Sequence, residues 1–163
     1  MIRGTAWLSL LAWAVSEWQL ASDRSRHRSQ ARASFTLGAL LLLVHTALSL
    51  KLRHGWSQAD AWREIARQTE QMTGLAFGGG LLINYAFALF WLAEAAWWWR
   101  APDGYVRRSA TALRFSRAVF AFMFVNGAVV FAHGPMRLVG ALVMLAVFAS
   151  WYGPGRGGGR DDG

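Results

Sequence analysis

The stretch Ser34-Phe-Thr-Leu-Gly-Ala-Leu-Leu-Leu-Leu-Val-His-Thr-Ala-Leu-Ser-Leu-Lys-Leu52 is almost wholly apolar, and its first charged residue is Lys51. A helix that spans the hydrocarbon core of a bilayer needs about 20 such residues. A helix on the surface of a soluble domain would instead need a polar face, which this stretch lacks. The stretch therefore predicts a transmembrane helix.

Further apolar stretches of this kind lie at about 5–21, 72–99, 118–133 and 138–152. Hydrophobic residues make up 55% of the chain and charged residues 16%, against about 25% charged residues in soluble domains. The predicted fold is an all-α integral membrane protein, a bundle of about five transmembrane helices in one domain over 1–152.

The N-terminal stretch predicts a retained helix, and the C-terminal segment predicts a flexible tail. The first apolar stretch ends in Gln19-Leu20-Ala21, whereas a signal-peptide cleavage site needs small residues at its last and third-last positions. We therefore expect the first stretch to be retained as a helix. The Gly- and Arg-rich segment 153–163 has almost nothing to bury and predicts a flexible tail.

Basic residues are distributed unevenly between the apolar stretches. Eleven lie in the first gap (22–33), the third gap (100–117) and the tail, and six lie elsewhere. Lysine and arginine concentrate in cytoplasmic loops, so this bias predicts an inner (cytoplasmic-type) membrane protein with its N-terminus out and its C-terminus in. The basic residues that give the net charge of +8 lie mainly in the gaps between the apolar stretches. We therefore expect them to contact lipid headgroups and expect no binding of nucleic acid.

The longest outer-side gap has a pattern of its own at about 57–71. Ser57-Gln-Ala-Asp60 resembles a helix-capping sequence, and Trp56, Trp62 and Ile65 then recur at helical spacing opposite charged residues. These features predict a short amphipathic helix. It either lies in the plane of the membrane interface or extends the third span beyond the membrane.

Three polar residues at membrane depth are candidates for function, because a charge there is expensive and usually faces the protein interior. They are Glu17 in the first span and Asn84 and Glu94 in the third. Asn84 and Glu94 fall on one stripe at three- and four-residue steps, so we expect both to be buried against other helices. The alternative for each carboxylate is a pair with an arginine near the interface.

A second group of candidates would line one polar pocket in the outer half of the membrane. His45, Asn126 and His133 are polar groups in apolar surroundings, and Gly79 and Gly80 lie in a glycine run that permits close approach. Two interpretations stay open: the polar groups bind one another, or the space above the glycines holds haem b or a quinone. The sequence predicts no metal site, and without cysteine it excludes thiolate ligands.

No catalytic residues are predicted, since the chain contains no zinc-protease motif, phosphate-binding loop or nucleophile elbow. The sequence favours a small non-enzymatic accessory or structural subunit of a membrane complex, with other membrane subunits or further copies of itself as partners. The alternative is a redox subunit that binds haem b or quinone toward the outer leaflet. A third possibility is a small transporter that uses Asn84 and Glu94 in a polar pathway.

Overall fold

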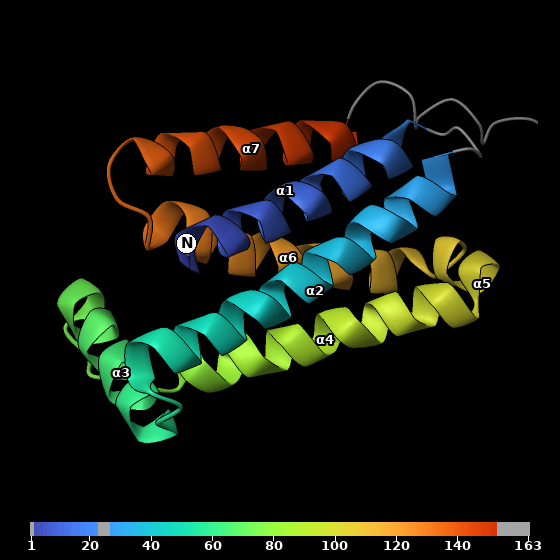
Figure 1. Cartoon of the computed structure of the whole chain (residues 1–163). Helices are drawn as coiled ribbons and strands as arrows, with labels where there is room; N and C mark the ends of the chain where they lie inside the picture. The colour runs from blue at the N-terminus through green and yellow to red at the C-terminus, as the bar shows by residue number, and fades with distance from the viewer. Residues whose placement is uncertain (1, 23–26, 153–163) are drawn as a thin grey trace, which may run out of the picture. The chain divides into compact units, whose positions relative to one another are not determined.

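The computed structural model describes residues 2–22 and 27–152, and every regular element in these ranges is a helix (Figure 1). The prediction of an all-helical fold is confirmed. The expected flexible tail (153–163) and part of the first gap (23–26) lie outside the described residues. The elements are α1 (Ile2–Ala21), α2 (His27–His54), α3 (Gln58–Thr73), α4 (Gly80–Arg100), α5 (Pro102–Val106), α6 (Ala110–Val125), the π-helical turn η1 (Asn126–Val130) and α7 (Pro135–Tyr152).

Four segments among the described residues are long and apolar enough to cross a membrane: α2, α4, α6 together with η1, and α7. The expected count of five spans is therefore not confirmed. The first predicted span is present as helix α1, but Ser9, Ser16, Glu17 and Gln19 interrupt its apolar sequence. Composition alone therefore leaves α1 below the hydropathy of a spanning helix.

The third predicted span begins later than expected. The apolar sequence predicted a span from 72, but α3 continues to Thr73 and α4 begins at Gly80. Gly74 ends α3 in a left-handed conformation (φ 78°), which only glycine adopts freely. The glycine run therefore forms the entry to α4, not the outer half of a longer helix.

The last apolar region divides into two helices, as the separate stretches at 118–133 and 138–152 predict. Gly134 has a positive φ of 64°, and α7 begins at Pro135, where proline has no amide hydrogen to leave unsatisfied. The helix before this turn ends at Val130, three residues earlier than expected.

The described residues form two compact units. The first unit contains residues 2–9 and 36–107, and the second contains 10–22, 27–35 and 108–152. Helices α1 and α2 each contribute one part to both units.

Aromatic side chains form the interior of the first unit. Phe87, Trp91 and Trp98 of α4 are buried, and the Trp91 indole lies so close to α2 that a Cβ on Gly38 would come within 2.6 Å of it. The Ser9 hydroxyl of α1 donates a hydrogen bond of 2.8 Å to the Gly38 carbonyl. One glycine of α2 therefore accepts contacts from both neighbouring helices.

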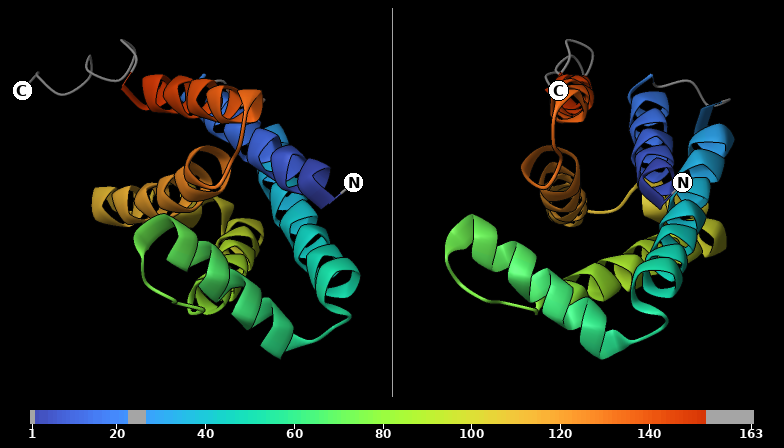
Figure 2. Two further views of the ribbon diagram at one scale, coloured as in Figure 1. Left: turned by 90° about the vertical axis from the view of Figure 1, so that its left-hand side faces the viewer. Right: turned by 60° about the vertical axis from the view of Figure 1, so that its left-hand side comes forward.

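Helix α3 crosses the ends of α2 and α4 instead of continuing either one (Figure 2). The Ser57 hydroxyl caps its N-terminus by accepting a hydrogen bond from the Asp60 amide, the capping role that the sequence predicts. The Tyr85 hydroxyl of α4 donates to the Gln58 side chain at 2.7 Å. This contact holds the start of α3 against α4.

The second unit is built around Trp13, which is fully buried. Its indole stacks on Phe120 and Phe124 of α6, with ring centroids 5.5 and 4.9 Å apart. The Ser16 hydroxyl donates to the Ala31 carbonyl of α2 at 2.8 Å. Polar groups of α1 therefore face neighbouring helices rather than the exterior.

Candidate functional site

A buried carboxylate joins three helices in the second unit. Glu17 of α1 is 5% exposed, and its Oε2 accepts a hydrogen bond of 2.7 Å from the indole nitrogen of Trp151 on α7. The same oxygen lies 3.3 Å from the Arg117 guanidinium of α6. Residues far apart in the sequence thus meet at one carboxylate oxygen.

The Arg117 guanidinium completes this cluster from a second direction. Its Cζ lies 4.8 Å from the centre of the Trp151 ring, within the range of a cation–π contact. The arginine therefore contacts the carboxylate and the indole, and the indole donates to the same carboxylate. We call Glu17, Arg117 and Trp151 the acid–arginine–tryptophan cluster. Its geometry is suited to holding helices together.

Glu94 is the second buried carboxylate and lies in the first unit. The Tyr105 hydroxyl of α5 donates to its Oε2 at 2.9 Å, and the Tyr105 ring stacks on Trp98 with centroids 4.6 Å apart. These contacts hold the five-residue helix α5 against α4. The carboxylate again serves a contact between helices.

Asn84 is exposed, so the prediction that it shares a buried face with Glu94 is wrong. At about 100° per residue, Asn84 and Glu94 are separated by about 80° around α4. The buried residues Phe87, Trp91 and Trp98 lie between or near these directions, and Asn84 falls at the edge of their stripe. It also lies only four residues after the start of α4.

His45 lies half-buried on α2 in the first unit. Its Nδ1 is 3.2 Å from the Thr5 hydroxyl of α1, so this imidazole takes part in a local polar contact. Asn126 and His133 belong to the second unit. The expected convergence of the three residues on one pocket stays a prediction.

The glycine run is closely packed by side chains of the same unit. A Cβ on Gly78 would lie 2.4 Å from the Trp62 indole nitrogen, and one on Gly80 would lie 3.0 Å from Ile65. Gly79 is covered by the Phe77 ring in the same way. A ring-shaped ligand over these glycines would have to displace the Trp62 or Phe77 ring.

Asn126 and His133 do not lie on one helix, although both were expected to line the same pocket. The helix ends at Val130, before His133 is reached, and His133 is exposed in the turn before α7. The Asn126 amide donates to the Phe122 carbonyl one turn earlier at 2.7 Å. Arg137 donates to the Val129 carbonyl at 2.7 Å, and so satisfies the end of the π-helical turn.

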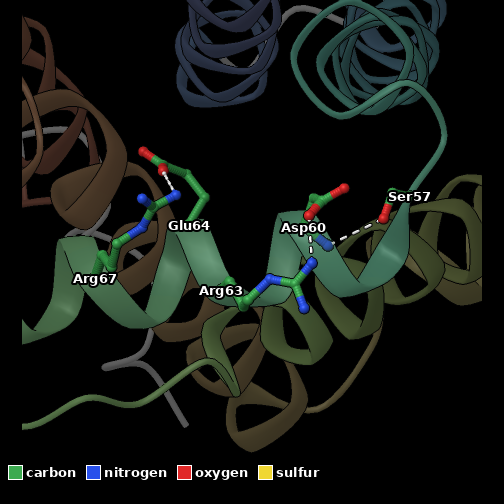
Figure 3. Close-up of polar contacts among 5 residues, drawn as sticks. All are labelled: Ser57, Asp60, Arg63, Glu64 and Arg67. Carbon is green, nitrogen blue, oxygen red and sulfur yellow. Dashed lines mark hydrogen bonds and ion pairs between the residues drawn. The ribbon is translucent and has the colours of Figure 1, made fainter.

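An open, charged hollow of about 420 Å³ lies between the end of α2 and α3. We call it the α2–α3 hollow, and its lining residues are Arg53, His54, Asp60, Glu64 and Arg67. On α3, Asp60 pairs with Arg63, and Glu64 pairs with Arg67 at 2.7 Å (Figure 3). Both pairs are largely exposed, so each contributes little to stability.

Both carboxylates of the hollow are held in the charged form. The Ser57 hydroxyl, followed by the Arg63 guanidinium, keeps the pKa of Asp60 below its usual value. The side-chain amide of Gln68 does the same for the pKa of Glu64, with a smaller contribution from Arg67. At neutral pH the hollow therefore presents fixed negative and positive charges side by side.

Comparison of the chain with protein-family models, curated proteins and solved structures gives no match. Within 2–22 and 27–152, no group of three or more His, Cys, Asp or Glu side chains could hold a metal ion.

Sequence reasoning missed four residues that complete the polar contacts: Tyr105, Arg117, Arg137 and Trp151. The only available signal was their chemistry, since each carries a donor that a buried carboxylate or a free carbonyl can use. Spacing along one helix gives no information about a partner on another helix.

Proposed function

We propose that this chain is a multi-pass inner-membrane protein that acts as a non-enzymatic accessory or structural subunit. The observation that carries the proposal is that both buried acids are used for contacts between helices. Glu17 binds Arg117 and Trp151, and Glu94 accepts from Tyr105. A transporter with a polar pathway needs such groups to face a hydrated path, whereas these two carboxylates are buried and are used for contacts between helices.

We further propose five crossings, with the N-terminus out and the C-terminus in. Support comes from α1, which pairs antiparallel with α2: Thr5 lies at His45, Ser9 at Gly38 and Ser16 at Ala31. If α2 crosses the membrane, α1 lies beside it over most of the crossing. Its serines donate to α2 carbonyls, which lowers the cost of placing a polar helix in lipid.

The proposed partner surface is the exposed face of α4. Leu82 and Leu89 are 59% and 67% exposed, and Ala86 and Ala93 fall on the same face at four- and three-residue steps and are exposed. Alternating large and small apolar residues permit close packing of a second membrane helix. We propose that another membrane subunit or a second copy of this chain binds there.

Cross-linking through single cysteines tests this surface, because the natural chain has none. In membranes, Ala86→Cys should form an oxidised dimer if copies pair, or should link to a second protein with a bifunctional thiol reagent. Ala88→Cys is the matched control, since Ala88 lies two residues away and is buried. Equal cross-linking at both positions, or none at Ala86, would contradict the proposed surface.

A second experiment, on the protein purified in detergent, tests the redox alternative. An absorption spectrum with a Soret band that disappears in a His45→Ala variant would favour the redox subunit over the structural one.

A further inference from the structure

The α2–α3 hollow carries charges of both signs on facing elements. Arg53 and His54 come from the last turn of α2, while Asp60, Glu64 and Arg67 come from α3. All five side chains line the same open hollow. A ligand that suits this hollow therefore carries both an anionic and a cationic group.

A tight turn fixes the hollow at the end of α2. Gly55 has a left-handed φ of 53°, and its amide donates to the Lys51 carbonyl at 3.1 Å, as in a helix that ends at a left-handed glycine. The Trp56 amide donates further back, to the Leu50 carbonyl at 3.0 Å. Trp56 itself has a φ of 70°, which is strained for a residue with a side chain. This strained residue lies in the turn that joins α2 to α3, next to Arg53 and His54 in the sequence.

Exposed apolar residues adjoin the charged lining in the sequence. Leu52, before Arg53, is 61% exposed, and Trp56, two residues after His54, is 57% exposed. Tryptophan is enriched at the level of lipid headgroups, and α2 is one of the segments apolar enough to cross a membrane. If α2 crosses the membrane as proposed above, the hollow at its end lies at the level of the lipid headgroups.

We propose that the α2–α3 hollow binds the phosphoethanolamine group of a membrane phospholipid. Arg53 and His54 bind the phosphate, for which guanidinium is a preferred partner, and Asp60 and Glu64 bind the ammonium. The exposed Glu64–Arg67 pair exchanges its weak contact for contacts with the ligand. A headgroup with a phosphate and no ammonium fits less well, because it would face the two carboxylates. The proposal rests on the membrane placement proposed above.

The test is native mass spectrometry of the full chain, purified in detergent and offered equal amounts of phosphatidylethanolamine and phosphatidylglycerol. We expect about fivefold preference for phosphatidylethanolamine, the size of one solvent-exposed ion pair. Arg53→Gln should lower retention of phosphatidylethanolamine about fivefold. Glu64→Gln should remove the preference by weakening phosphatidylethanolamine and strengthening phosphatidylglycerol.

Matched controls come from the same two helices. Lys51→Gln removes a positive charge from the end of α2, and Glu70→Gln removes a negative charge from α3, but neither residue lines the hollow. Both variants should retain the native preference. The soluble headgroup glycerophosphoethanolamine should compete poorly, because it has no acyl chains.

Three results would overturn the proposal: phosphatidylglycerol retained as strongly as phosphatidylethanolamine, equal effects of Lys51→Gln and Arg53→Gln, or glycerophosphoethanolamine bound as tightly as the lipid. Alkaline extraction of membranes tests separately whether the chain is an integral membrane protein. A chain that is extracted refutes the membrane placement, whereas a chain that stays in the membrane without lipid preference refutes only the headgroup site.

Discussion

Replacing Glu17 with glutamine should destabilise the protein strongly, because the substitution leaves Arg117 without its carboxylate. Removing one partner of a fully buried ion pair costs about 3–5 kcal/mol. In this pair the arginine and glutamate side chains are 15% and 6% exposed, and the guanidinium keeps its contact with the Trp151 ring. We therefore expect a somewhat smaller loss of about 2–3 kcal/mol in the free energy of unfolding.

The assay is unfolding of the purified protein in mixed micelles, followed by far-ultraviolet circular dichroism as the denaturing detergent is increased. A double-mutant cycle separates the ion pair from the rest of the site. The variant that combines Glu17→Gln with Arg117→Gln should be more stable than the sum of the single losses predicts, by about 1–2 kcal/mol.

The matched control is Glu64→Gln, which breaks an ion pair with side chains 69% and 36% exposed. Its effect should stay below about 1 kcal/mol. A loss at Glu17 no larger than the loss at Glu64, or an additive double mutant, would refute the structural role of the acid–arginine–tryptophan cluster.

Two further predictions concern α3 and its contacts. Gly78→Ala should destabilise the first unit, because its Cβ would lie 2.4 Å from Trp62. Gly127→Ala, where nothing lies within 4 Å, should be neutral or slightly stabilising; thermal unfolding of the two variants compares them, and equal midpoints would contradict the packing. The lowered pKa values of Asp60 and Glu64 stabilise the folded α3 above the unfolded-state values of about 3.9 and 4.3. That stabilisation is lost as the pH falls through the folded values, so amide exchange of residues 58–64, corrected for intrinsic rates, should increase below about pH 4. Unchanged protection of these amides from exchange at low pH would contradict the stabilising role of the two carboxylates.

The sequence predicted those features of the fold that depend on local physics. Long apolar runs predicted the helices, the capping pattern predicted Ser57 as the N-cap of α3, and the interruption between the last two apolar stretches predicted the break before α7. Each of these signals acts within a few residues of itself, so no tertiary information was needed.

The features that sequence missed depend on neighbouring helices. Asn84 belongs to a stripe with the right period, yet it is exposed, because periodicity does not say where a neighbouring helix covers the stripe. The partners of Glu17 lie 100 and 134 residues along the chain. An isolated acid in an apolar run indicates that a partner is needed, but not which residue supplies it.

Thiol labelling of intact bacterial cells with a membrane-impermeant reagent tests the proposed membrane placement most directly. Single cysteines at Gly4, Ser29 and Gln71 suit it, because all three residues are exposed and a Cβ on Gly4 meets open space. Five crossings predict that Gly4→Cys and Gln71→Cys are labelled in intact cells, and that Ser29→Cys is labelled only after the membranes are opened. If Gly4→Cys, like Ser29→Cys, is labelled only after the membranes are opened, α1 does not cross the membrane and the chain crosses it four times. Labelling of Ser29→Cys in intact cells, with Gln71→Cys protected, would contradict the orientation.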